Sequence, residues 1–163
     1  MFLQSCQDYI KYISDKLPSV AELSALPEPV AIVIIGCGAP SLIPFYAEST
    51  SCTFPIYAEP TRRLYSELRL TKSFARSEIL PDYITNTWLI GAAIRSFSQI
   101  FGRIMHNDWW KGGSKGQGGG EFLFEDGKVT WCHRMRNTMD HSNIGKIKEV
   151  LGLPVDEDVV EGA

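Results

Sequence analysis

The spacing of apolar residues in the first part of the chain predicts a helix followed by a buried strand. Residues 5–17 place apolar side chains at helical spacing, with Ser5 as the expected N-cap. The apolar and mostly β-branched run from Val30 to Ile35 does not alternate with polar residues, which is typical of a parallel strand covered on both faces. It ends at the tight exit Gly36-Cys37-Gly38.

The second part of the chain predicts a long helix and then a β-hairpin. Apolar residues form one broad helical stripe over residues 87–105, and a glycine-rich connector follows at 111–120. Apolar and polar positions then alternate over Glu121–Glu125 and again over Lys128–His133, with the turn dipeptide Asp126-Gly127 between them. This pattern predicts an antiparallel hairpin.

The end of the chain predicts a closing helix and a tail. Asp140 or Ser142 is the expected cap of a last helix that runs to Leu151. Helices around a parallel strand, followed by a hairpin and a helix, indicate a layered α/β fold. We expect one domain over residues 1–153 and a flexible acidic tail over residues 154–163.

Composition and charge narrow the classes of partner. The length of 163 residues suits one domain, and the net charge of −3 gives no reason to expect nucleic acid or an anionic membrane as partner. No apolar run approaches the roughly 20 residues that span a bilayer. The N-terminus lacks the basic and apolar pattern of a secretion signal, so we expect a cytoplasmic protein.

The cysteines argue against a disulfide scaffold or a structural metal. The four cysteines, Cys6, Cys37, Cys52 and Cys132, are few and widely scattered. No CxxC pair is present, so a structural zinc site is not expected, and nothing in the sequence calls for another metal or a cofactor.

Two groups of motifs resemble a known family. Residues 119–124 and 126–129 are similar to the strand-turn-strand near the end of peroxiredoxin and thioredoxin-like domains. Asn137, Asp140 and His141 within HRMRNTMDHSNI resemble the signature of the peroxiredoxin-like AhpC/TSA antioxidant branch, particularly its fungal forms. The segments IVIIGCGAPSLIPFY and FPIYAEPTRRLYSEL resemble the second strand, helix and acidic-proline turn of the same family.

The resemblance covers roughly residues 2–152 and implies a thioredoxin-like, three-layer α/β/α fold with a mixed sheet. In that fold a CxxC motif opens the first helix, whose dipole and free backbone N–H groups stabilise a thiolate. Cys6 matches the second cysteine of the motif, but the first falls on Leu3. The motif therefore cannot run its usual dithiol cycle in this chain.

The resemblance also implies a central strand before the CxxC motif, between the 30–35 strand and the hairpin. No sequence for this strand precedes the first helix, so we expect an N-terminally shortened version of a longer protein. Loss of the strand would leave backbone groups of both neighbours unpaired, at about 1–3 kcal/mol for each buried group.

Cys6 and Cys37 are the candidate catalytic residues. Cys6 is either a reactive thiol at the start of a helix or an inert remnant of the motif. Cys37 follows a parallel strand at the sheet edge that also carries the start of the first helix, so it is either a disulfide partner of Cys6 or a small residue in a glycine turn.

A polar cluster near the last helix is the second candidate site. It contains His133, Arg134, Asp140 and His141. A histidine and an aspartate can act as base and orienting group, or bind a metal. The structural alternative, which we favour, has Asp140 capping the helix and Arg134 paired with a carboxylate.

Three functions remain open from the sequence. The first is a thiol-dependent antioxidant or oxidoreductase that uses Cys6 with Cys37 or an external thiol, with a thioredoxin-type or glutathione-type reductant as partner. The second is a non-redox tailoring enzyme that acts on a small metabolite, since a fold does not fix a function. The third is a catalytically silent remnant. A homodimer is compatible with each of them.

Overall fold

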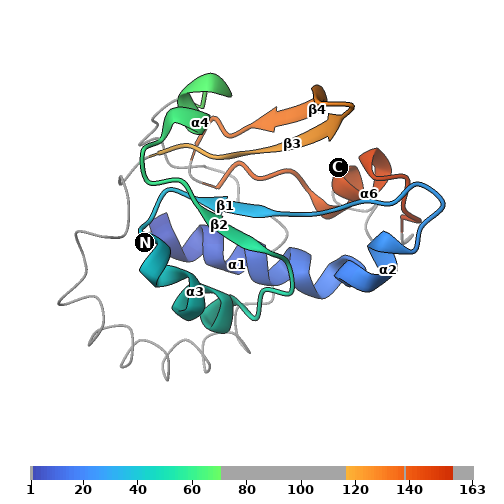
Figure 1. Ribbon diagram of the computed structural model, residues 1–163, viewed down its shortest axis with the longest axis horizontal. Coiled ribbons are helices and arrows are strands. Elements are labelled where there is room, and N and C mark those ends of the chain that lie inside the picture. The colour runs from blue at the N-terminus through green and yellow to red at the C-terminus, as the bar shows by residue number, and fades with distance from the viewer. Residues whose placement is uncertain (1, 71–116, 138, 156–163) are drawn as a thin grey trace.

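The computed structural model describes residues 2–70, 117–137 and 139–155 (Figure 1). The elements in chain order are α1 (Phe2–Lys16), α2 (Val20–Ser24), β1 (Ile34–Gly36), the short 3-10 helix η1 (Pro40–Leu42), α3 (Ile43–Thr50), β2 (Ile56–Ala58), α4 (Arg63–Glu67), β3 (Gly120–Glu125), β4 (Lys128–Arg134) and α6 (Ile144–Val150). In Figure 1, β1 lies between β2 and the β3–β4 hairpin, and α1 and α3 lie next to each other. The predicted α/β class is confirmed.

Helix α1 supplies much of the core, as its periodicity predicts. Tyr9, Ile10 and Ile13 on the helix and Leu17 just after it are all buried, and they pack in one cluster with residues of α2, α6 and the loops. The helix begins at Phe2, however, so the prediction that Ser5 caps it is wrong. Cys6 consequently lies in the second turn of α1 and not at its N-terminus.

The strand predicted over Val30–Ile35 is shorter and less buried than expected. Only Ile34–Gly36 pairs with β2, in parallel register. Val33 and Ile35 are 48% and 40% exposed, so the prediction of a strand covered on both faces is wrong. The physical reason is that Val30, Ile32 and Ile34 point to the core cluster, and alternate side chains of extended backbone point away from it.

The hairpin is confirmed almost residue for residue. Strands β3 and β4 pair in antiparallel register from Gly120 opposite Arg134 to Glu125 opposite Lys128. Asp126 and Gly127 have φ angles of 48° and 76°, the left-handed pair that a tight two-residue hairpin turn requires.

The described strands form two separate two-stranded sheets, β1–β2 and β3–β4. The resemblance implies one mixed sheet whose central strand would lie between them. No strand among the described residues takes that position, so the two halves remain unpaired with each other.

The closing helix forms as predicted but with a different cap. Asn143 precedes α6, and its side chain accepts a hydrogen bond from the backbone N–H of Lys146 at 2.8 Å. The prediction that Asp140 or Ser142 caps this helix is therefore wrong. Ile144 at its start and Leu153 just after it are buried in the same core cluster as α1.

Several predictions fall on residues that the structure does not describe. These are the helix over 87–105, the glycine-rich connector up to residue 116 and most of the acidic tail. Within the described ranges, no helix has the length and apolar character needed to cross a membrane.

Candidate active site around Cys6

The site begins on one face of α1. Cys6 is half-buried and Tyr9 is 3% exposed, and the two residues share a face because they lie three positions apart. Burial of Tyr9 in the core cluster fixes the direction of this face. It turns Cys6 toward the segment between β4 and α6.

His141 lies on that segment, against α1. Its ring stacks on the Tyr9 ring with centroids 4.0 Å apart and an angle of 10° between the planes. The Tyr9 hydroxyl donates a hydrogen bond of 3.0 Å to the backbone carbonyl of Ser142. These two contacts hold the imidazole in place against the helix that carries Cys6.

Glu121 on β3 binds the other side of the histidine. Its Oε1 lies 3.0 Å from His141 Nδ1, and its Oε2 accepts a hydrogen bond of 3.4 Å from the Ser142 backbone N–H. The side chains of His141 and Glu121 are only 9% and 16% exposed, so water screens their attraction weakly. The carboxylate orients the ring and favours its charged form.

The surroundings raise the pKa of His141 to about 9. Burial by itself would lower this pKa, but the interactions of the ring with Cys6 and with the Glu121 carboxylate outweigh it. The imidazole therefore carries a positive charge at neutral pH. Cys6, His141 and Glu121, which we call the α1 thiol site, place a cation between a cysteine and a carboxylate.

Cys37 lies near the same region, at the exit of β1. The Tyr65 hydroxyl donates a hydrogen bond of 2.9 Å to the Ile35 carbonyl, two residues before Cys37. Burial, followed by the charges of Cys37, Glu59 and Cys6, raises the pKa of Tyr65 above its usual range. Both candidate cysteines therefore lie within electrostatic reach of one phenol.

All four cysteines of the chain are free thiols. Burial, together with the charges of Cys6 and Cys52, also raises the pKa of Tyr46. Cys52 donates a weak hydrogen bond of 3.5 Å to the Phe54 carbonyl and packs against the core. Three of the four cysteines thus influence the pKa of Tyr46 or Tyr65.

The predicted polar cluster divides into separate parts. His133 Nε2 lies 2.8 Å from the Asp140 backbone oxygen and 3.6 Å from its Oδ1. Asp140 Oδ2 accepts hydrogen bonds from the Arg136 backbone N–H and guanidinium at 2.8 and 2.9 Å. Burial would raise the pKa of Asp140, but these bonds and the charges of Arg136 and His133 lower it overall. Asp140 thus fixes the loop before α6 without capping the helix.

No carboxylate of the described residues pairs with Arg134, which corrects the prediction. Its Nε donates to the Leu68 carbonyl at 2.8 Å, its Nη1 donates to Cys132 Sγ at 2.9 Å, and the guanidinium lies 5.3 Å from the centre of the Phe122 ring. His141, the fourth member, belongs to the α1 thiol site, where its ring contacts Tyr9 and Glu121.

The sequence pattern did not identify Glu121 and Tyr9 as site residues. Glu121 stands in the alternating pattern of β3 on the same face as Leu123, and a carboxylate at such a half-buried position calls for a cationic partner. Tyr9 gave no such signal, because its helical spacing marks it only as a core residue. A buried tyrosine hydroxyl still needs a hydrogen-bond partner.

The described residues contain no group of three or more histidine, cysteine, aspartate or glutamate side chains that could hold a metal ion. With this geometry in view, comparison with known proteins identifies the family. The model of the AhpC/TSA antioxidant enzyme family matches residues 14–137. The chain belongs to the AhpC/TSA antioxidant family. Its α/β arrangement is accordingly a thioredoxin-like fold.

Relatives in this family include peroxiredoxin-like 2C of Homo sapiens, which is 25% identical over 151 residues, and that of Mus musculus, which is 24% identical over 150 residues. Each alignment covers 91% of this chain and 63% of the relative, so the chain spans less than two thirds of their length. No solved structure matches the chain. Cys6 and His141 both lie outside the segment that the family model matches.

Proposed function

We propose that this chain is a thiol-dependent antioxidant oxidoreductase in which Cys6 is the reactive thiol. The observation that carries the proposal is the position of His141, which stacks on Tyr9 of the helix that carries Cys6 and has a pKa of about 9, so that the ring is charged at neutral pH. A cation beside a cysteine favours the thiolate, the form that attacks peroxides and disulfides.

Because of its position in α1, Cys6 needs His141 as a source of positive charge. Helix dipole effects fall off within the first turn, and Cys6 lies in the second turn of α1. His141 and Glu121 therefore do for this thiol what the start of the helix does in the intact CxxC motif. Glu121 acts as a positioning residue because it works through the imidazole.

The reaction follows from these roles. The Cys6 thiolate attacks one oxygen of a hydroperoxide, so that an S–O bond forms and the O–O bond breaks. The leaving oxygen takes a proton from the His141 imidazolium, which yields water or an alcohol. Sulfur is oxidised to a sulfenic acid while the peroxide is reduced.

A second thiol must then reduce the sulfenic acid, because Leu3 stands where the motif would supply the other cysteine. Condensation of the sulfenic acid with a thiol forms a disulfide and releases water. Cys37 is the internal candidate, since its charge and that of Cys6 both act on Tyr65. An external thiol is the alternative, and in either case two thiols of a reductant restore the cysteine.

The test compares Cys6→Ser with Cys132→Ser, which removes another half-buried cysteine that also faces a cation. We expect hydrogen peroxide consumption with dithiothreitol to fall by roughly 100-fold or more in Cys6→Ser and to stay within about twofold in Cys132→Ser. Dimedone labelling followed by peptide mass spectrometry should place the sulfenic acid on Cys6. Disulfide mapping in Cys37→Ser then decides between the internal and the external second thiol.

Undiminished turnover in Cys6→Ser would exclude the redox assignment. Activity on a small metabolite that survives thiol alkylation but is lost in His141→Ala would instead support the non-redox tailoring enzyme. Absence of peroxide turnover in the wild-type protein, with every thiol reduced, would favour the catalytically silent alternative.

A further inference from the structure

Three arginines flank one serine on α4, and the protein neutralises none of them. Arg62 and Arg63 lie one helical turn before Ser66, and Arg69 follows just after the end of the helix. Within the part of the chain that the structure describes, no carboxylate pairs with any of these three guanidiniums. The whole chain has a net charge of −3, so this local positive charge runs against the overall charge of the protein.

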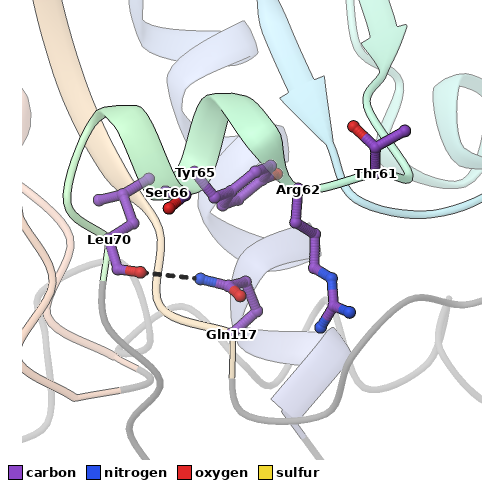
Figure 2. Close-up of a pocket in the computed structure, with 6 residues that line it drawn as sticks. All are labelled: Thr61, Arg62, Tyr65, Ser66, Leu70 and Gln117. Atoms are coloured by element: carbon purple, nitrogen blue, oxygen red, sulfur yellow. Dashed lines mark hydrogen bonds between the residues drawn. The ribbon is translucent and has the colours of Figure 1, made fainter.

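Arg62 and Ser66 line the same polar cavity beside α4. The backbone N–H of Ser66 donates a hydrogen bond of 3.1 Å to the Arg62 carbonyl, so the two residues follow one another on the same side of the helical turn. In Figure 2 both side chains lie on the side of α4 that faces Gln117. The cavity has a volume of about 280 Å³, enough for several water molecules, so a phosphate group fits between the hydroxyl and the guanidinium.

The polar groups of the cavity leave Arg62 as the donor for an added anion. Gln117 already uses its amide Nε2 for the carbonyls of Leu70 and Gly118, each at 3.2 Å. The Thr61 hydroxyl donates to the Glu59 carboxylate. Ser66 is exposed, so its hydroxyl is within reach of a modifying enzyme.

Helix α4 also connects the two sheets. The Tyr65 hydroxyl donates to the Ile35 carbonyl of β1 at 2.9 Å, and Arg134 of β4 donates to the Leu68 carbonyl at 2.8 Å. The helix has only five residues, a length that is not stable by itself, so it can unwind locally to enter the active site of an enzyme. A new charge on α4 therefore acts on the segment that links β1 to the hairpin.

We propose that Ser66 is a phosphorylation site and that Arg62 binds its phosphate in the cavity. The partner is a protein kinase that selects arginines before the serine, as Arg62 and Arg63 are placed here. The γ-phosphorus of ATP forms a bond to Ser66 Oγ, its bond to the ADP oxygen breaks, and the hydroxyl proton passes to a base of the kinase. The phosphate carries about −1.5 to −2 charges at pH 7, and a guanidinium binds it through two parallel hydrogen bonds.

The negative groups of α4 oppose the phosphate less than the arginines favour it. The Glu59 carboxylate is already bonded at the start of the helix, where it accepts from the Leu64 N–H at 3.2 Å. Glu67 is next to Ser66 in sequence, but adjacent residues of a helix do not face each other. The Ser66 carbonyl at the end of α4 already accepts a bond of 3.0 Å from the Arg69 N–H. We therefore expect phosphorylation to stabilise α4.

The phosphate site is tested in the full chain with phosphoserine incorporated in place of Ser66. Phosphorus NMR measures the second pKa of the phosphate, which is ordinarily about 6 and should fall below about 5.5 at this position, because a cation favours the dianion. The matched control carries phosphoserine in place of Ser24, an exposed serine at the end of another five-residue helix in a segment without arginine. Its phosphate should titrate near the ordinary value of about 6.

Two variants of the chain phosphorylated at Ser66 identify the ligand of the phosphate. Arg62→Gln should return the pKa toward about 6, whereas Arg62→Lys keeps the charge and should keep the pKa lowered. Hydrogen exchange of the Leu68 N–H should slow by roughly fivefold or more on phosphorylation, and this protection should be lost in Arg62→Gln. Circular dichroism checks that each variant is folded. Equal pKa values at positions 66 and 24, or a lowered pKa that persists in Arg62→Gln, would exclude Arg62 as the ligand.

Phosphoryl transfer is tested on the unmodified protein with ATP and the catalytic subunit of cAMP-dependent protein kinase, which selects serines that follow arginines. Peptide mass spectrometry should find phosphate on Ser66 and not on Ser24. Labelling of Ser66 should fall by roughly tenfold or more in Arg62→Gln, because the kinase reads the charge before the serine. Absence of phosphate on Ser66 in the wild-type protein would contradict the modification, and so would equal labelling of Ser24.

Discussion

Cys6 and Cys132 each face a cation, but the two surroundings differ in ways that matter for chemistry. The cation at Cys6 is the buried imidazole of His141, held by Glu121. The cation at Cys132 is the guanidinium of Arg134, on an exposed residue of β4 whose charge water screens. A histidine can also release a proton to a leaving group, which an arginine cannot do. A nearby positive charge alone therefore does not distinguish the candidate cysteine Cys6 from Cys132.

The helix that carries Cys6 is more deeply buried than the strand that carries Cys132. This difference predicts the largest effect of a substitution on the free energy of unfolding. Ile13 is 7% exposed on the helix that carries Cys6, and Val129 is 42% exposed on the strand that carries Cys132. Ile13→Ala should lower the free energy of unfolding by about 2–5 kcal/mol through lost burial and a cavity. Val129→Thr should change it by less than about 0.5 kcal/mol. Urea denaturation measures both, and equal effects would contradict the comparison.

Substitution of His141 or of Arg134 tests whether the cation beside Cys6 controls its reaction with peroxide. His141→Gln should slow the reaction of Cys6 with hydrogen peroxide by roughly 30-fold to 100-fold, because the charge that favours the thiolate and the proton for the leaving oxygen are both lost. The control, Arg134→Gln, should leave the rate at Cys6 unchanged. Stopped-flow measurement of sulfenic acid formation gives the rates, and a Cys6 rate that is indifferent to His141→Gln would remove the histidine from the mechanism.

The pH dependence of stability tests the charge on His141 directly. Its pKa is raised from 6.5 to about 9 in the folded protein, so the stabilisation is fully present below pH 6.5 and is lost as the pH rises through 9. The wild-type protein should exceed His141→Phe in unfolding free energy by on the order of 2 kcal/mol near pH 6. That difference should shrink toward pH 10. A difference that is constant from pH 6 to 10 would mean that the ring is already neutral.

The smallest expected effect concerns the cap that follows His141. Asn143→Ala removes the side-chain acceptor for the Lys146 backbone N–H and should cost about 1 kcal/mol of stability. The hairpin that carries Cys132 offers no comparable substitution, because a β-strand has no helix cap. Thermal unfolding measures the loss, and peroxide turnover below the unfolding transition should remain within about threefold of wild type.

The sequence determined the elements whose signal is local. The helical spacing of Tyr9, Ile10 and Ile13 reports one buried face of α1, because a helix repeats every 3.6 residues whatever it packs against. The dipeptide Asp126-Gly127 fixes the hairpin in the same way, since both residues accept positive φ. The family resemblance, which the match over residues 14–137 confirms, likewise came from order and spacing along the chain.

Tertiary structure alone decided the partners of the candidate site residues. Tyr9 bonds to Ser142 across 133 positions of sequence, and the same contact of α1 with the segment before α6 brings His141 to Cys6. The sequence grouped His141 with Asp140 because the two are adjacent, yet the Asp140 side chain bonds to Arg136 and the His141 ring to Glu121. Burial then strengthens the attraction between Glu121 and the charged His141 ring, because little water reaches either side chain.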